Sequence, residues 1–174
     1  SFTGIRTVIS TAIGIKISNN HITSIGINSL AGLAMSALCE AKKMRLKYII
    51  SSIDSKRDDL FIQVFKINYI EKNSLPFSVI NEIDTIKINN LQNYLVNNNL
   101  IFEDIIFIGY QSNKVKEVVN TLNVSKNLKQ SPNSLGVGKL VSCIIKNKIN
   151  INKTTFAFDK FKPIYVRSAQ INIR

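Results

Sequence analysis

Apolar residues at helical spacing predict two helices at the start of the chain. Isoleucine, valine and alanine recur every three or four positions between residues 5 and 18, as on one face of a helix. Ile15 and Ile17 fall outside that stripe, so this helix is expected to need partners on more than one side. Asn28 can cap a second helix, which is predicted to end at the basic run 42–45.

The apolar period then changes from about 3.6 to 2, which is typical of strands. A hairpin is expected around the polar turn 54–59, and a further turn at 71–74. The strands predicted along the chain are 22–27, 48–53, 60–65, 77–83 and 105–108. The later helices are predicted around 91–95, over 114–122, and from Asn133 or Ser134 to Ile145. Neighbouring strands followed by alternating helix and strand indicate a sheet covered by helices, and hence an α/β fold.

The charge allows two interpretations. With 23 Lys and Arg against 11 Asp and Glu, the net charge is +12 at pH 7, which favours binding to phosphates. Most of these cations are lysines, the chain is also rich in Asn and Ile, and no dense basic block contains interleaved aromatic residues. Composition bias is therefore the stronger interpretation, and a basic functional surface is the alternative.

Several site classes are disfavoured by what the chain contains. A single histidine, His21, argues against a histidine metal site, and no catalytic or metal-binding residues are predicted. Cys39 and Cys143 lie in helical apolar stripes and are expected to be buried thiols. No apolar run approaches the roughly 18–20 residues that cross a bilayer, so no membrane contact and a cytoplasmic location are expected.

Four short segments carry a resemblance to a known family. They are SFTGIR at 1–6, IGINSL at 25–30, IDSKR at 53–57 and PIYVR at 163–167. In this order they resemble the SFTGxR, IGVSSL, IDARR and PxYLR motifs of the TsaB (YeaZ) family. The Gly-Pro-Gly that precedes SFTG in that family has no counterpart, since the sequence starts at Ser1.

The resemblance implies an actin-like (ASKHA, ribonuclease H-like) two-lobe α/β fold with the first lobe truncated. Residues 1–45 are then expected to be a remnant of the first lobe, and residues 46–174 the second lobe with a C-terminal tail. The strand at 22–27 is expected to be the one strand left to the first-lobe sheet.

The resemblance also implies a function. TsaB-like proteins are non-catalytic scaffold subunits that support TsaD, which makes N6-threonylcarbamoyladenosine at position 37 of tRNAs reading ANN codons. The expected partners are a TsaD-type transferase, a TsaE-type ATPase, tRNA indirectly through the complex, and a second copy of the chain as an alternative. No cofactor is expected, and any nucleotide would lie at the interface with TsaD.

Two groups of site residues follow from the resemblance. The expected partner-binding residues are Phe2, Thr3, Arg6, Ile9, Ile13 and Lys16. Asp54 and Arg57 are candidates for a pseudo-active-site cleft, although a hairpin turn favours such polar residues in any case. Arg6 is equally well interpreted as a solvated helix charge.

Three rival hypotheses stay open. The chain could be an M22-type glycoprotease-like hydrolase, although it lacks a convincing catalytic set. It could be a truncated, non-functional remnant of the TsaB family. It could also be a basic RNA-binding module that acts alone, with the steep salt dependence of phosphate contacts.

Overall fold

The computed structural model describes residues 2–69, 74–126, 130–151, 154, 156–158, 163–164 and 166, with backbone alone for Phe2 and Phe158. Ser1, Tyr165 and Arg167 of the motifs lie outside the described residues, as do residues 71–73 of the predicted turn.

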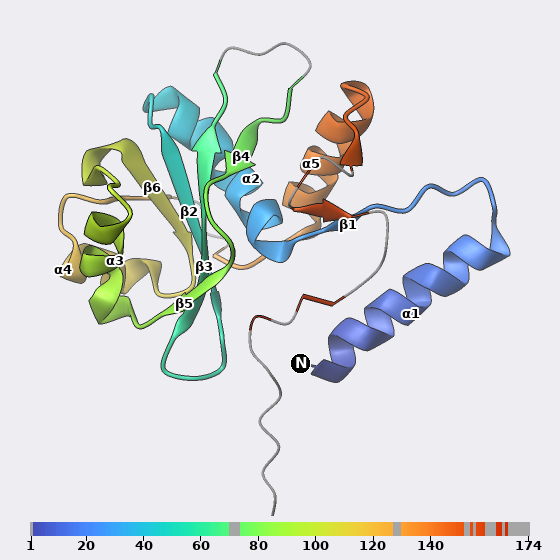
Figure 1. Ribbon diagram of the computed structural model, residues 1–174, viewed down its shortest axis with the longest axis horizontal. Coiled ribbons are helices and arrows are strands. Elements are labelled where there is room, and N and C mark those ends of the chain that lie inside the picture. Colours follow the sequence, from blue (N-terminus) through green and yellow to red (C-terminus); the bar gives the residue numbers. More distant parts are fainter. Residues whose placement is uncertain are drawn as a thin grey trace, which may run out of the picture.

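A mixed six-stranded sheet forms the centre of the molecule (Figure 1). Its strands follow the order β4-β3-β2-β6-β7, and β5 pairs with the other part of β3. They are β2 (Tyr48–Asp54), β3 (Leu60–Ile67), β4 (Phe77–Val79), β5 (Asp84–Ile86), β6 (Ile105–Gly109) and β7 (Asn123–Val124). Strand β2 is antiparallel to β3 and parallel to β6. The predicted hairpin and the α/β class are therefore confirmed.

Helices cover both faces of this sheet. On one face α2 (Ser29–Lys43) and α5 (Ser134–Lys146) enclose a core that includes Ile49. On the other, α3 (Leu91–Asn97) and α4 (Ser112–Val118) enclose a core that includes Ile50. Successive β2 residues point to opposite faces, so neighbouring isoleucines serve different cores. Two short 3-10 helices complete this part, η1 (Ile88–Asn90) and η2 (Phe102–Asp104).

Asparagine caps begin both helices of the first face, as predicted. The Asn28 Oδ1 accepts a hydrogen bond from the Leu30 N–H at 2.9 Å, and the Asn133 Oδ1 accepts from the Gly136 N–H at 3.0 Å. The Asn28 Nδ2 also donates to the buried Gln63 Oε1 at 2.8 Å, which ties the start of α2 to β3.

The predicted strand 22–27 is wrong over most of its length. Strand β1 comprises Gly26–Ile27 alone and pairs antiparallel with β8 (Ala157–Phe158). Ile22 is exposed, and its N–H bonds to the Asn19 carbonyl in a turn. The partner of β1 comes from near the other end of the chain, so local alternation could not define its extent.

Two other element boundaries also differ from prediction. Of the expected strand 77–83 only β4 is a strand, and β5 begins beyond it at Asp84; between the two, the Asn81 Oδ1 accepts from the Val64 N–H at 3.2 Å. The helix expected over 114–122 is the shorter α4, and Leu122 packs into the core just before β7. Cys39 is exposed rather than buried, because it lies on the outer face of α2.

Helices α2 and α5 approach each other closely at two glycines. A Cβ atom built on Gly136 would lie 2.1 Å from the Gly32 carbonyl oxygen, so no side chain fits there. On the same helix, a Cβ on Gly138 meets nothing within 4 Å. Alanine at Gly138 therefore tests helix propensity alone, whereas alanine at Gly136 also tests the close contact between the two helices.

We expect Gly136→Ala to destabilise the fold by about 1–3 kcal/mol, because backbone must move to relieve the clash. Gly138→Ala is the matched control and should stabilise by about 0.5–1 kcal/mol, the usual helical preference for alanine. Urea unfolding followed by circular dichroism measures both, and equal effects of the two substitutions would contradict the close contact.

Candidate partner-binding surface

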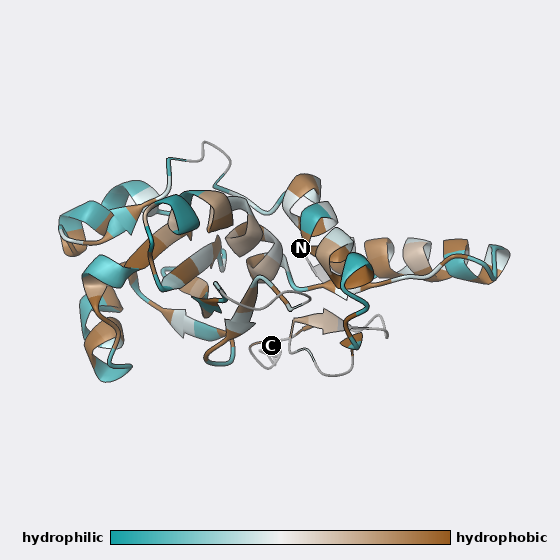
Figure 2. Cartoon of the chain, turned by 90° about the horizontal axis from the view of Figure 1, so that it is seen from above, coloured by the Kyte–Doolittle hydropathy of each residue, from teal (hydrophilic) through white to brown (hydrophobic). Residues whose placement is uncertain are grey.

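Helix α1 (Phe2–Ser18) lies apart from the sheet and its covering helices, at the end of the connection 19–25 (Figure 1). From Thr3 to Ser18 every side chain is exposed except Ile9 and Ala12, which are half-buried. Val8 and Ile17 are 70% and 74% exposed. Figure 2 shows the helix projecting from the body with hydrophobic positions along its length. A helix of this composition is normally covered.

The two sides of α1 differ in chemistry. At about 3.6 residues per turn, the apolar side chains gather on one side and the small polar ones on the other. The apolar side carries Ile5, Val8, Ile9, Ala12 and Ile13, and Ile15 and Ile17 widen it at its two edges. On the other side, the Thr7 hydroxyl donates to the Thr3 carbonyl and the Thr11 hydroxyl to the Thr7 carbonyl, each at 3.0 Å. Those hydroxyls are satisfied within the helix, whereas the apolar side is exposed except at the half-buried Ile9 and Ala12.

Four of the six predicted partner-binding residues fall on one stripe of α1. Arg6, Ile9, Ile13 and Lys16 are spaced at i, i+3, i+7 and i+10 in one continuous helix, so they follow each other along one side. Ile13 is 39% exposed, and both cations are exposed at the two ends of the stripe.

The other two predicted residues differ. Thr3 lies on the small polar side, and the Phe2 side chain is outside the described residues. The prediction missed Ile5, Val8 and Ile17, which flank the stripe and are exposed. Their helical spacing was visible in the sequence, but the same spacing also fits burial against the chain's own core.

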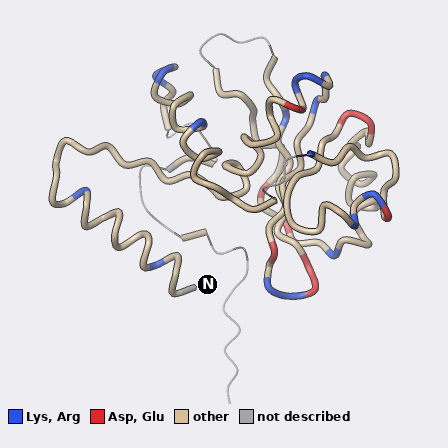
Figure 3. The backbone as a smooth tube through the Cα atoms, turned by 180° about the vertical axis from the view of Figure 1, so that it is seen from behind, with Lys and Arg blue, Asp and Glu red and all other residues tan. Residues whose placement is uncertain are grey.

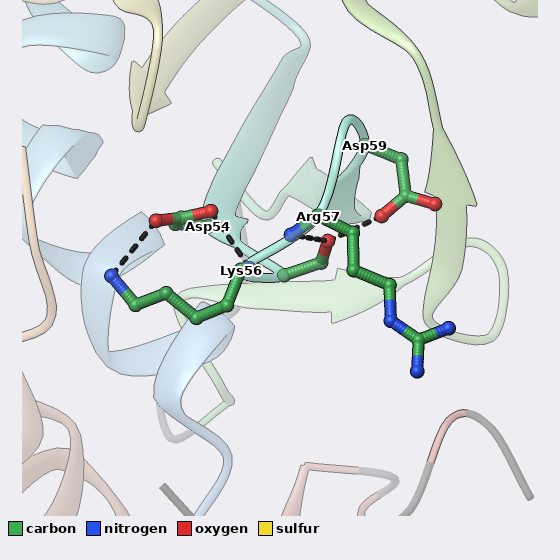
Figure 4. A network of polar contacts seen from close by, with 5 residues as sticks. Asp54, Lys56, Arg57 and Asp59 are labelled. Carbon is green, nitrogen blue, oxygen red and sulfur yellow. Dashed lines mark hydrogen bonds and ion pairs between the residues drawn. The ribbon is translucent and has the colours of Figure 1, made fainter. Parts of the chain in front are cut away.

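At the hairpin tip, Asp54 and Arg57 do not pair with each other. The Asp54 carboxylate bonds to the Lys56 Nζ at 2.9 Å and accepts from the Lys56 N–H at 2.8 Å, while the Arg57 side chain points away (Figure 4). Ser55 bonds to Asp59 and accepts from the Arg57 N–H at 3.2 Å. These contacts form a polar turn, with Lys56 at a φ of 64°. The proposed cleft role of Asp54 and Arg57 stays a prediction.

The ion pair shifts both ionisations at this turn. The Lys56 ammonium, which donates a hydrogen bond to Asp54, lowers the pKa of that carboxyl, and the Lys56 N–H adds to the effect. The same pair raises the pKa of Lys56.

Within the described ranges, no three His, Cys, Asp or Glu side chains come together as a metal site, and none of the helices is long and apolar enough to cross a membrane.

Comparison with solved structures identifies the architecture. YeaZ from Pseudomonas aeruginosa superposes with a TM-score of 0.60 at 12% identity, over 95% of this chain and 69% of YeaZ. A crystal structure of an uncharacterized protein with similarity to peptidase YeaZ, from the same organism, gives 0.59 at 13% identity, over 96% and 69%. The chain has a YeaZ-like fold. No protein family and no curated protein matches the sequence.

The YeaZ-like fold extends into α1. The 4% of this chain left uncovered amounts to about seven residues, fewer than the 17 of α1, so part of that helix belongs to the shared fold. The mixed α/β sheet of this chain agrees with this likeness, and the actin-like type stays a prediction. The division at residues 45 and 46 and the shortened first lobe stay predictions.

We expect the pKa of Asp54 to lie below its ordinary value of 3.8 in the folded protein and to rise in Lys56→Gln. A lowered pKa favours the folded state above about pH 4, and this contribution is lost as pH falls through the lowered value. Carboxyl NMR titration measures it, with Lys87→Gln as control, and an unchanged Asp54 pKa in Lys56→Gln would contradict the pairing.

Proposed function

We propose that this chain is a non-catalytic scaffold subunit of the TsaB type, which binds a TsaD-type transferase through α1. In this proposal it supports the synthesis of N6-threonylcarbamoyladenosine at position 37 of tRNAs that read ANN codons. A TsaE-type ATPase and the tRNA join through the complex, and any nucleotide lies at the interface with the transferase. The YeaZ-like fold and the four motifs support this proposal.

The observation that carries the proposal is the largely exposed apolar side of α1. Burying a large aliphatic side chain is favourable by about 1.5–3 kcal/mol, so exposed isoleucines on a regular helix favour association. Monomeric proteins rarely leave a large continuous apolar patch open, and such patches mark interaction sites. Ile5, Val8, Ile13 and Ile17 are all exposed along this helix.

The chemistry of the stripe describes the partner that fits it. Ile9 and Ile13 lie between Arg6 and Lys16, so the complementary surface is an apolar helix or groove with acidic residues at its two ends. Charges at the rim contribute to orientation and association rate more than to affinity. If two copies of α1 paired with their like ends together, Arg6 would lie opposite Arg6 and Lys16 opposite Lys16. This repulsion favours a different protein as the partner.

We expect Ile13→Asp to weaken association with the cognate TsaD-type transferase at least tenfold, because it places a charge in the centre of the stripe. Thr11→Asp is the matched control, since it adds the same charge on the other side of α1 and should change the affinity less than threefold. Sedimentation velocity of mixtures at micromolar concentrations measures both, after circular dichroism has shown that both variants fold.

Three results would overturn the proposal. One is the absence of any complex between the unmodified chain and the transferase. Another is an equal loss of affinity in both variants, which would mean that the transferase does not bind specifically to the apolar side of α1. The third is peptidase activity in the purified chain that a single substitution abolishes, which would restore the glycoprotease hypothesis. Self-association blocked by Ile13→Asp, without a heterocomplex, would assign α1 to a second copy.

A further inference from the structure

A cationic surface lies at the end of the central sheet where β2 and β6 begin. It is made by exposed residues of three elements that are far apart in the sequence, and we call it the amino-end surface. It comprises Lys42, Lys43 and Arg45 at the end of α2, Lys66 and Tyr69 at the end of β3, and Lys146 and Lys148 at the end of α5.

Hydrogen bonds hold the three elements together across this surface. The Tyr69 hydroxyl donates to the Leu46 carbonyl at 2.6 Å, which joins the end of β3 to the turn after α2. The Asn68 Nδ2 donates to the Leu75 carbonyl at 2.9 Å, and the Asn147 Nδ2 donates to the neighbouring Ser74 carbonyl at 3.2 Å. These bonds join the end of β3 to the turn after α2 and to the end of α5. Lys66 pairs with Tyr48, which packs against the core under α3 and α4, so Lys66 lies on that face of the sheet end and the cations of α2 and α5 lie on the other face.

The cations of the amino-end surface are largely uncompensated among the described residues. Two ion pairs form among the described residues, Lys47 with Asp104 at 2.8 Å and Lys56 with Asp54. Neither pair includes a cation of the amino-end surface. The nearby Glu40 carboxylate is occupied by the Ser125 hydroxyl and the Lys126 N–H. A single helix end accounts for Lys42 and Lys43 through the helix dipole, but not for Lys66 on a strand.

Five of the nine acidic residues that the structure describes lie at the opposite end of the sheet. Asp54, Asp58 and Asp59 lie in the β2–β3 hairpin together with Lys56 and Arg57, and Glu82 and Asp84 lie beside it. Glu40 in α2 and Glu103 and Asp104 in η2 lie toward the amino end, where the cations outnumber them. Figure 3 shows both kinds of charge at each end, with red segments on both sides of the blue hairpin tip and several blue segments at the opposite end. Such a charge distribution orients a polyanion toward the amino-end surface and away from the hairpin.

Tyr69 adds an aromatic ring to the same surface. It is 48% exposed, its hydroxyl is fixed to the Leu46 carbonyl, and the Lys42 Nζ lies 5.8 Å from the ring centroid. An exposed ring beside cations is the arrangement on which unpaired bases stack while phosphates bind the cations. Lys42 and Tyr69 are 27 positions apart in the sequence, so the fold alone brings them together.

We propose that the amino-end surface binds the phosphate backbone of a structured RNA. Cations spread over three elements match a repeated anion better than one bound anion, and the exposed tyrosine favours a nucleic acid over an acidic peptide. The choice of RNA over DNA rests on the proposed function, in which the RNA is the tRNA of the complex. The contact is separate from α1, so both partners can bind at once.

The test is fluorescence anisotropy with the isolated full chain and a labelled unmodified tRNA transcript, at several salt concentrations. In the triple variant Lys42→Gln, Lys43→Gln and Arg45→Gln, we expect the dissociation constant to rise at least tenfold. The slope of log affinity against log salt should fall by about two to three, since each phosphate contact contributes roughly 0.7–0.9.

The control variant removes three exposed lysines elsewhere, Lys87→Gln, Lys114→Gln and Lys116→Gln, and should change affinity less than twofold. Tyr69→Phe keeps the ring and Tyr69→Ala removes it, so a weakening in the alanine variant alone supports stacking. Thermal unfolding confirms that each variant is folded before binding is compared.

The proposal is overturned if tRNA does not bind, or if both triple variants weaken binding equally, which would indicate net charge alone. Equal binding to duplex DNA with the same number of phosphates would remove the RNA assignment. Tighter binding to polyglutamate or to vesicles containing phosphatidylserine would assign the surface to an acidic protein or a membrane. Failure here is distinguishable from failure of the scaffold function, because the triple variant should still bind the transferase through α1.

Discussion

Strand β2 is buried on both faces, and the arrangement of the other elements depends on how those faces are covered. Ile49 and Ile50 are each fully buried, in the core beneath α2 and α5 and in the core beneath α3 and α4. Two polar residues follow them, and both are satisfied: the Ser51 hydroxyl donates to the Leu30 carbonyl and the Ser52 hydroxyl to the Tyr110 carbonyl. The first bond anchors the start of α2, and the second the turn after β6.

These two bonds hold α2 and the turn after β6 close to the backbone of β2. Gly109 has a φ of 126°, and a Cβ there would lie 2.0 Å from the Ser52 carbonyl oxygen, so a side chain is excluded. The Gly32–Gly136 contact brings α5 against α2 in the same way. Helices α2, α3, α4 and α5 cover the two faces of the central sheet, and α1 is not among them, so most of its isoleucines are exposed.

The same architecture separates two surfaces of different chemistry. The uncovered side of α1 is apolar with a cation at each end, and it lies apart from the sheet. The amino-end surface is cationic, and it is assembled where α2, β3 and α5 end. Composition bias explains why lysine is common in this chain, but it does not explain why five of the nine described acids lie around the hairpin while six cations lie at the other end. That separation results from the fold and not from the average composition.

Much of the core architecture was predictable from local pattern. The hairpin of β2 and β3, the buried β6 and the asparagine caps of α2 and α5 agree with the sequence, because alternation and capping depend on neighbouring residues. Strands β1 and β8 were not predictable in extent, because each is defined by a partner about 130 residues away. Between β4 and β5 the Asn81 side chain, and not a backbone carbonyl, accepts the hydrogen bond from the Val64 N–H of β3.

For the candidate sites too, local features were predictable from the sequence and contacts between distant residues were not. The sequence by itself determined that Arg6, Ile9, Ile13 and Lys16 share one helix side, because helical spacing is local. It could not determine that this side is exposed, since an apolar stripe fits a core as well as an interface. Nor could it bring Lys42, Lys66, Tyr69 and Lys146 to one end of the sheet or pair Asp54 with Lys56 in place of Arg57. Exposure and distant proximity are properties of packing, and only the tertiary structure decided them.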